Sequence, residues 1–511
     1  MRLTGDKRGA NCRENYSPGE LNEKTVLFSA LMLALSSKAL GADLASSLED
    51  VDNGHSILIN EIESVTGNVI QDGTGKVYAI YLNDGKTYEV NQELSVNLTV
   101  KSQENMGATT RAFQNLGSNV VFNDKVSINL DVSNNADTGT VSSSAYDQFD
   151  NTSVANTQFN DDVYLHITGS QTKSTFTAAL RFGGAGEINF NGDSSVLIAE
   201  NYGYTAEGVN SLNAAGPINF KGGDVTIKAI SDYGVNGIVA PNINLSNRGT
   251  FNVESKLTDG FGCNTTGMDV DNLTVSNTVQ ALNISVIGAG QDRSGADGTY
   301  GLRVFGTSEI NGQNLVISVE SPDAEIPDGF EDYAVSYGIK NHKELTVGEN
   351  TKTLISVNDS YGDAVGILSG GGETALSILG DLEVNLSAAE GSRREAAKIE
   401  DGVATLGSQG HVVNLNGDVS VATVDVAELH MAGQSTINGD LSITDKGTLG
   451  VKDSLTINGK VNNEGSAQLQ NAYLSVDGDE SQMGAVSAEQ NSTIELGNGS
   501  YVLLMPPLLR C

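Results

Sequence analysis

Two adjacent carboxylates, Asp161 and Asp162, come closer than any other acidic pair in the sequence to a constellation for acid–base chemistry on a glycosidic bond. Glycoside hydrolysis uses two carboxyl groups that flank the scissile bond, and polysaccharide-cleaving sites on β scaffolds also need Arg, Lys or a bound Ca²⁺ nearby. No histidine or arginine motif accompanies this pair. We therefore interpret Asp161 and Asp162 as a solvated turn.

Nucleophilic catalysis and phosphate binding have no better support. Asn191-Gly192-Asp193-Ser194-Ser195 contains a Gly-Asp-Ser sequence, but a serine nucleophile needs a base, and none of the histidines lies in a recognisable setting. Gly85-Lys86-Thr87 matches the end of a phosphate-binding loop, yet Ile80 stands where that loop requires its first glycine. The sequence predicts no catalysis and no cofactor. The histidines are His55, His166, His342, His411 and His430.

Metal and redox chemistry are also weakly indicated. Gly183-Gly184-Ala185-Gly186 partly matches the calcium-binding nonapeptides of secreted solenoids, but it is not tandem and lacks the following Asp. Cys12, Cys263 and Cys511 have no zinc, disulfide or redox spacing, and we interpret Cys263 as a small buried residue. We predict no metal site, while weak Ca²⁺ binding by acidic loops stays an open alternative.

The charge balance excludes one class of partner. The formal net charge is −35 over 511 residues, and the Lys and Arg side chains are scattered, with Arg393-Arg394 the notable local pair. Nucleic-acid binding needs a basic stripe to neutralise phosphates, so we expect no nucleic-acid partner. The acidity is typical of a soluble, self-repelling exported protein.

The elements that would position any functional residue are short strands in a three-part repeat, which extends over residues 188–421. Its first part is an apolar run that begins at Ile188, Ile218, Ile243 and Leu273, with steps of 30, 25 and 30 residues. Its second part is an alternating run, as in Val196-Leu197-Ile198, Val225-Thr226-Ile227, Phe251-Asn252-Val253 and Leu282-Asn283-Ile284.

The third part of the repeat is an aromatic-glycine step. It occurs at Tyr233-Gly234, Phe261-Gly262, Tyr300-Gly301, Tyr337-Gly338 and Tyr361-Gly362. We interpret the rings as packing over or within the coil and the glycines as tight corners, with a carbohydrate-stacking ladder as the alternative. Three strands per unit at fixed order and loose spacing predict an all-β fold, a right-handed parallel β-helix with irregular loops between its strands.

The chain divides into five predicted segments. An apolar run from Thr25 to Leu35 follows several basic residues, which is typical of a cleaved signal peptide, and we predict cleavage after Gly41 or Ala42. Asn83-Asp84-Gly85 between two apolar runs is a hairpin signal in the second segment. The segments are 1–42, the signal peptide; 43–100, an N-terminal cap with the first coils; 101–410, a loop-decorated β-helix with projecting loops at 288–299, 320–332 and 388–400; 411–502, a regular stem; and 503–511, an irregular tail.

The leader at 1–42 and the Gly/Asn/Ser/Thr-rich acidic coils at 188–502 resemble the passenger domains of autotransporters, the type V secretion proteins of Gram-negative bacteria. The coils from Ile437 to Val461, with Asn-Gly-Asp-Leu-Ser-Ile, look most like the stem that precedes the translocator. Members of that family continue into an outer-membrane β-barrel translocator. The texture changes after Tyr501 and no barrel pattern follows before Cys511, so we expect a passenger separated from its translocator.

The resemblance implies an exported protein at the cell surface, on the outer membrane or released outside the cell. We expect an adhesin-like binding protein without catalysis, whose partner is a host-cell surface, the extracellular matrix or a glycan. Two alternatives stay open: a carbohydrate-active β-helix enzyme, either a polysaccharide lyase or a hydrolase, and a plain structural spacer.

Overall fold

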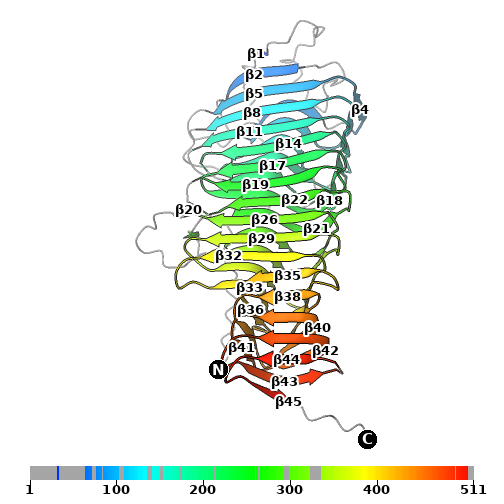
Figure 1. Cartoon of the computed structure of the whole chain (residues 1–511). Coiled ribbons are helices and arrows are strands. Elements are labelled where there is room, and N and C mark those ends of the chain that lie inside the picture. The colour runs from blue at the N-terminus through cyan, green and yellow to red at the C-terminus, as the bar shows by residue number, and fades with distance from the viewer. Residues whose placement is uncertain are drawn as a thin grey trace, which may run out of the picture.

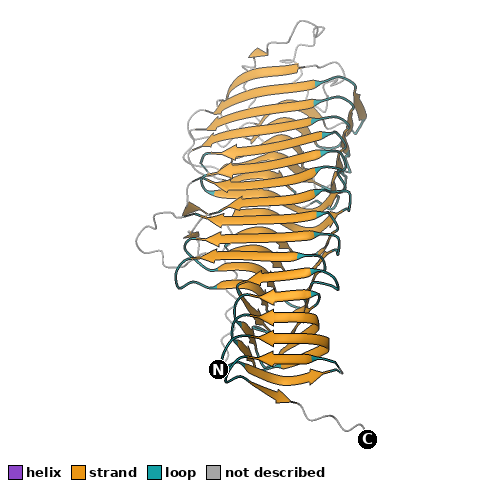
Figure 2. Ribbon diagram, viewed as in Figure 1, coloured by secondary structure: helices purple, strands orange, loops and turns teal. Residues whose placement is uncertain are grey.

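The chain folds into a parallel β-helix built almost entirely of strands (Figure 2). The computed structural model describes residues 32–33, 64–71, 76–82, 85–102, 109–134, 141–149, 154–171, 175–203, 205–211, 214–258, 261–262, 265–288, 291–292, 298–322, 335–489 and 491–504. These residues contain no helix, and hence none that is long and apolar enough to cross a membrane. Except for β1 and the β20–β23 pair, the strands form one continuous parallel sheet that winds around an apolar core.

Each coil contributes three strands, and strands in the same position of successive coils pair in parallel to form three sheet faces. In Figure 1 the strands nearest the viewer point left while the chain descends from its blue end to its red end, so the coil is right-handed. Both the parallel pairing and the handedness confirm the predicted fold class. We name the faces, in chain order, the front, second and third sheets.

The front sheet carries the longest strands. They are β2 (Ser64–Gln71), β5 (Leu94–Ser102), β8 (Val126–Asn134), β11 (Val163–Gln171), β14 (Ser194–Asn201), β17 (Asp224–Ser231), β19 (Thr250–Leu257), β22 (Ala281–Ile287), β26 (Asn314–Ser321), β29 (Lys352–Asp359), β32 (Leu382–Ala388), β35 (Val412–Asn416), β38 (Gln434–Ile437), the ends of β40 (Gly447–Ile457) and β42 (Ser466–Val476), and β44 (Thr493–Leu496).

The second sheet follows the front sheet in each coil. It contains β3 (Lys76–Leu82), β6 (Thr109–Asn115), β9 (Val141–Phe149), β12 (Thr175–Gly183), β15 (Thr205–Asn210), the starts of β18 (Gly234–Leu245) and β21 (Thr265–Val275), β24 (Thr299–Val304), β27 (Ser336–Asn341), β30 (Ala364–Ser369), β33 (Arg394–Ile399), β36 (Asp418–Val421), β39 (Leu441–Ile443), β41 (Val461–Asn463), β43 (Gln482–Ala488) and β45 (Tyr501–Leu504).

The third sheet has the shortest strands and closes each coil. It contains β4 (Thr87–Val90), β7 (Asn119–Phe122), β10 (Thr157–Phe159), β13 (Ile188–Phe190), β16 (Ile218–Phe220), the ends of β18 and β21, β25 (Thr307–Ile310), β28 (Glu344–Val347), β31 (Ala375–Ile378), β34 (Gly402–Leu406), β37 (Ala427–Met431) and the starts of β40 and β42. Three short strands lie outside these faces: β1 (Met32–Leu33), which is antiparallel to β2, and the pair β20 (Phe261–Gly262) with β23 (Gln291–Asp292).

The first part of the predicted repeat is in the register that the sequence indicates. Ile188 pairs with Ile218, Ile218 with Ile243 and Ile243 with Leu273. For the second part, the predicted register at β14 is wrong by one residue, because Val225 pairs with Ser195 and not with Val196. Ser195 is a buried polar residue at an inward position, so the apolar pattern alone misplaced the strand.

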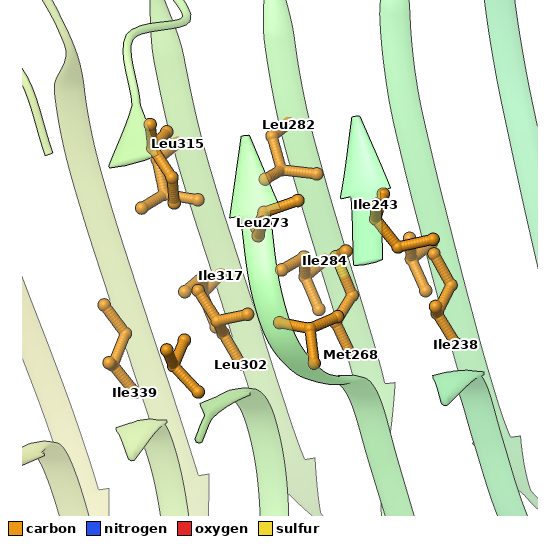
Figure 3. Close-up of a cluster of buried hydrophobic side chains, with 14 of the residues drawn as sticks. Ile238, Ile243, Met268, Leu273, Leu282, Ile284, Leu302, Leu315, Ile317 and Ile339 are labelled. Atoms are coloured by element: carbon orange, nitrogen blue, oxygen red, sulfur yellow. The ribbon is translucent and has the colours of Figure 1, made fainter. Parts of the chain in front are cut away.

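The core is a single apolar column inside the coils. Figure 3 shows aliphatic side chains of successive coils meeting there, among them Ile238, Leu302, Ile317 and Ile339. Toward the N-terminal end, four phenylalanines of the third sheet stack on one another with ring centroids 5.0, 5.0 and 4.7 Å apart. These rings belong to Phe122, Phe159, Phe190 and Phe220, all fully buried.

A glycine column in the second sheet sets how closely that sheet packs against the front sheet. A Cβ on any of these glycines would lie 2.3 Å from a β-branched side chain of the front sheet and 2.5 or 2.6 Å from a carbonyl oxygen of the next coil. This close approach leaves no room for a Cβ at these positions. Glycine is required for that reason and not for its conformational freedom, because the φ angles are not left-handed. They are Gly208, Gly237, Gly267, Gly301, Gly338 and Gly366.

This column corrects our interpretation of the aromatic-glycine steps as one repeated feature. Gly301 and Gly338 belong to the column, whereas Gly234 pairs with Thr205 near the start of the strand, three residues earlier. Tyr361-Gly362 lies before β30, where the backbone N–H groups of both residues donate to the Asp359 carboxylate. The pairs therefore occupy different places, and Gly301 and Gly338 are not tight corners.

The predicted hairpin at Asn83-Asp84-Gly85 is wrong. The strands on either side of it, β3 and β4, pair in parallel with β6 and β7 of the next coil, and no described pairing joins β3 to β4. A corner of a β-helix and a hairpin turn both favour glycine and short polar residues, so local sequence did not distinguish them.

The coils shorten toward the C-terminus. On the front sheet, paired residues of adjacent coils are 26 residues apart at Val225 and Phe251 and 38 apart at Leu315 and Thr353. From Val413 onward the spacing is 22 residues or less, as at Val413 and Ser435. We call the coils before Val413 the wide coils and those after it the narrow coils.

Asparagine ladders mark the coil corners. In the wide coils Asn123, Asn160 and Asn191 each donate a side-chain amide hydrogen bond of 2.7 to 3.0 Å to the asparagine one coil earlier. A second ladder continues into the narrow coils, where Asn438 donates to Asn416 and Asn458 donates to Asn438. Such ladders hold the register of neighbouring coils without introducing charge.

Candidate functional site

A six-residue pattern occurs in two adjacent coils and brings aromatic and cationic side chains together. Tyr300-Gly301-Leu302-Arg303-Val304-Phe305 extends along β24, and Tyr337-Gly338-Ile339-Lys340-Asn341-His342 extends along β27. The two strands pair in parallel, with Tyr300 opposite Tyr337 and Arg303 opposite Lys340. We call the resulting group the tyrosine–cation array; it comprises Tyr300, Arg303, Phe305, Tyr337, Lys340 and His342.

The array faces away from the core because of the glycine column. Gly301 points toward Ile317 of the front sheet, and Leu302 lies in the core shown in Figure 3. Gly301 and Leu302 both face the inside of the coil. Their neighbours Tyr300 and Arg303 therefore lie on the side of the strand away from the core. The same pattern in β27 places Tyr337 and Lys340 beside them.

The rings of the array stack across the two coils. Tyr300 and Tyr337 have ring centroids 5.2 Å apart and planes within 6° of parallel, and Phe305 and His342 are 4.7 Å apart and within 4°. Within the tyrosine pair, Tyr300 is fully buried and Tyr337 is half-buried. The other pair lies at the corner between the second and third sheets, where Phe305 is 40% exposed.

Arg303 lies between the two ring pairs, and Lys340 lies beside the tyrosine pair. The Arg303 guanidinium carbon is 4.8 Å from the Tyr300 ring centroid and 5.1 Å from that of Phe305. The Lys340 ammonium lies 5.1 Å from the Tyr300 centroid and 5.2 Å from that of Tyr337. These distances are within the range of cation–π attraction, so the cations hold the rings in place.

Asp269 of β21 completes the charge balance at Arg303, whose Nη2 donates to the Asp269 carboxylate at 2.5 Å. Burial, together with the positive charges of Lys340 and Arg303, lowers the pKa of His342 to about 4, while Asp269 opposes them. The His342 ring is therefore neutral at physiological pH and stacks on Phe305 as an uncharged imidazole.

The exposed corner beside Phe305 and His342 carries polar side chains and little bulk. The Thr307 hydroxyl donates to Glu344 Oε2 at 3.2 Å, and the Thr307 backbone N–H donates to Asn272 Oδ1 at 3.1 Å. In the following coil the corner is Gly371-Gly372, both with left-handed φ. A Cβ at Gly371 would lie 3.0 Å from His342 Nδ1, while one at Gly372 would meet nothing within 4 Å.

The carboxylate pair from the sequence is part of a coil corner. Asp162 lies 3.7 Å from the Lys125 ammonium and accepts the Ser194 backbone N–H at 3.0 Å, and Asp161 accepts the N–H of Asp162. Both side chains serve the turn, as we interpreted them. Among the described residues, no group of three or more His, Cys, Asp or Glu side chains is placed to hold a metal ion.

The other sequence candidates also lie apart from the array. Gly192 packs against the Asp161 carbonyl in the corner next to it, and Gly85 is a left-handed corner residue before β4. Gly186 is pressed against the Ala155 carbonyl, where a Cβ would lie 1.8 Å from its oxygen. Close backbone packing explains Gly192 and Gly186, and the left-handed φ explains Gly85.

Several predictions fall on residues outside the described ranges. The cleavage positions Gly41 and Ala42 lie there, as do Cys12, Cys263 and Cys511. Of the three projecting loops, 388–400 is fully described and consists of a short turn followed by β33, while 288–299 and 320–332 are described only in part. The two strands of the array follow these two connections directly.

Sequence reasoning missed Arg303, Lys340, Phe305 and His342. A signal was present, because a cation follows each tyrosine by three residues and a second ring follows by five. Grouping Tyr300 and Tyr337 with all aromatic-glycine pairs concealed the longer pattern. No model of a known protein family matches the chain, and neither does any curated protein or solved structure.

Proposed function

We propose that this chain is an exported β-helix protein that binds a ligand at a cell surface or in the surrounding medium and performs no catalysis, in the manner of an autotransporter passenger. The observation that carries the proposal is the tyrosine–cation array, in which two adjacent coils repeat the same aromatic and cationic pattern, which reaches the surface at the Phe305–His342 corner. Solenoids bind through extended faces and corners of this kind rather than through one deep pocket.

The chemistry around the array supports binding more than turnover. The nearest charged groups, Arg303 and Asp269, are paired with each other, and His342 is held neutral by burial and by its cationic neighbours. Groups that are fixed in this way suit recognition of shape and of hydrogen-bonding pattern. The partner classes that we propose are a host-cell surface, the extracellular matrix or a glycan, and the net charge of −35 argues against nucleic acid.

The test compares the full chain with two variants on immobilised host-cell layers, matrix proteins and glycans. The double change Phe305→Ala and His342→Ala removes the exposed ring pair, and Tyr473→Ala removes a ring of similar exposure, 39%, from the narrow coils. We expect the full chain and Tyr473→Ala to bind one of these surfaces equally and the double variant to lose binding. Cleavage of a polysaccharide by the full chain, or no binding to any surface, would contradict the proposal.

A further inference from the structure

The exposed corner of the array has the composition of a sugar-binding platform. Phe305 presents an apolar ring that is 40% exposed, and His342 supports it from the next coil with a parallel ring. An exposed aromatic edge suits contact with the apolar face of a pyranose ring, and the stacked His342 keeps Phe305 in one orientation without a ligand. Gly371 and Gly372 add no side chain that would cover the edge of His342.

Hydrogen-bonding groups surround the platform at the distance of neighbouring side chains. Thr307 and Glu344 begin β25 and β28 two residues after Phe305 and His342, and both are exposed. Glu344 Oε2 accepts the Thr307 hydroxyl, and among the described residues Oε1 has no hydrogen-bond donor. A carboxylate oxygen that is held in position and open to solvent is a strong acceptor for sugar hydroxyl groups.

The charges decide between neutral and acidic sugars. The chain carries a net charge of −35, and Glu344 adds a local negative charge at the corner. Arg303 and Lys340 are the two cations of the array, and the carboxylates of Asp269 and Glu344 bring the sum of these four charges to zero, while His342 is uncharged at physiological pH. An acidic glycan would therefore meet repulsion at long range and find no net positive charge beside the ring.

We infer that the corner formed by Phe305, His342, Thr307 and Glu344 binds a neutral glycan, with one sugar ring packed against the exposed part of Phe305 and its hydroxyl groups donating to Glu344. This inference rests on the proposed binding function and specifies the ligand class and the residues that contact it. The stacked ring supplies affinity, and the carboxylate selects the hydroxyl pattern.

The experiment measures binding of the full chain to neutral glucose-, galactose- and N-acetylhexosamine-terminated oligosaccharides and to sialylated, uronate-containing and sulfated counterparts. We expect binding to members of the neutral set. Because no ion pair forms, the dissociation constant should change by less than about twofold between 50 and 500 mM NaCl. Phe305→Ala is expected to weaken that binding by about tenfold or more. Tyr473→Ala, the control ring, is expected to leave it within about twofold.

Glu344→Gln provides a second variant on an exposed side chain, which leaves the packing of the coil intact. Because it replaces a charged acceptor by a weaker one, we expect about three- to tenfold weaker binding of the same sugars with an unchanged circular dichroism spectrum. Neutral-sugar binding that both Phe305→Ala and Glu344→Gln leave unchanged would overturn the site. Binding of acidic glycans or matrix proteins alone would overturn the inference and leave the proposed function standing, whereas failure to bind any surface would remove both.

Discussion

The wide coils and the narrow coils solve the same packing problem with different amounts of chain. On the front sheet, paired residues of adjacent wide coils are 26 to 38 positions apart in the sequence. In the narrow coils the distance is 22 positions between Val413 and Ser435 and 19 between Leu455 and Leu474. Both keep parallel register and asparagine ladders. The extra length in the wide coils enlarges the interior and the corners, and there the tyrosine–cation array is found.

The interiors differ accordingly. Wide coils bury stacked aromatic rings such as Phe159 and Phe190, whereas the narrow coils bury aliphatic side chains such as Leu415, Ile437 and Leu455. A larger cross-section needs larger side chains to reach the packing density of a protein interior. Coil length therefore determines which residues form the core, and the tyrosine–cation array lies in the longer coils.

The largest expected effect separates the two interiors. Phe190→Ala removes a fully buried ring that stacks on Phe159 and Phe220, and we expect a loss of about 3–5 kcal/mol in the free energy of unfolding. Leu455→Ala in the narrow coils should cost less, about 2–3 kcal/mol, because the removed side chain is smaller. Denaturant unfolding of both variants checks the order, and equal losses would contradict the proposed difference between the interiors.

A second change tests the close packing of the second sheet in the wide coils. Gly301→Ala places a Cβ 2.3 Å from Ile317 Cγ2 and 2.5 Å from the Gly338 carbonyl oxygen, and overpacking of this kind should cost about 2–3 kcal/mol. Gly312→Ala is the matched control, since its Cβ would meet its nearest atom at 3.3 Å. Hydrogen exchange of the β24 and β26 amides reports the local loss, and protection equal to that of the control would argue against the contact.

The pH dependence of stability offers a third test, centred on His342. Its pKa is about 4 in the folded chain and about 6.5 when unfolded, so the unfolded state takes up a proton first as the pH falls. Stability from this group is complete above pH 6.5 and is lost between pH 6.5 and 4. Allowing for its partial exposure, we expect a loss of about 2 kcal/mol.

The comparison variant for this test is His342→Asn, which keeps a polar side chain but cannot titrate there. The difference in unfolding free energy between pH 7 and pH 4 should be smaller in the variant than in the parent chain by the amount assigned to His342. Lys340, Arg303 and Asp269 surround the ring and are the same in both proteins. An identical pH profile for the two would show that burial does not hold the imidazole neutral.

The smallest effect concerns the narrow coils. The ladder of Asn416, Asn438 and Asn458 continues in the next coil at Asp477, where a carboxylate cannot donate a hydrogen bond to the Asn458 carbonyl. Asp477→Asn restores the donor, and we expect a gain of about 0.5–1.5 kcal/mol. Thermal unfolding measures it, with Asp479→Asn as the control off the ladder; a gain no larger than that of the control would mean that the ladder adds no stability.

The sequence predicted the β-helix because alternating apolar residues report directly which side chains face inward. The apolar pattern is misleading where an inward residue is polar, as at Ser195, and the turn pattern is misleading where a coil corner contains the residues of a hairpin turn, as at Gly85. The array could be predicted only in part. Tyr300 and Tyr337 were noticed, but their contact depends on parallel pairing of residues 37 positions apart, which no local pattern contains.

The sequence distance between paired residues also determines how much chain is released when the molecule unfolds under a pulling force. Because each coil bonds only to the coils beside it, pulling on the two ends should detach one coil at a time rather than break the whole core at once. At about 3.4 Å per extended residue, each wide coil would release about 100 Å of chain and each narrow coil about 70 Å. A single-molecule extension trace would thus record the change from wide to narrow coils as a change in step length.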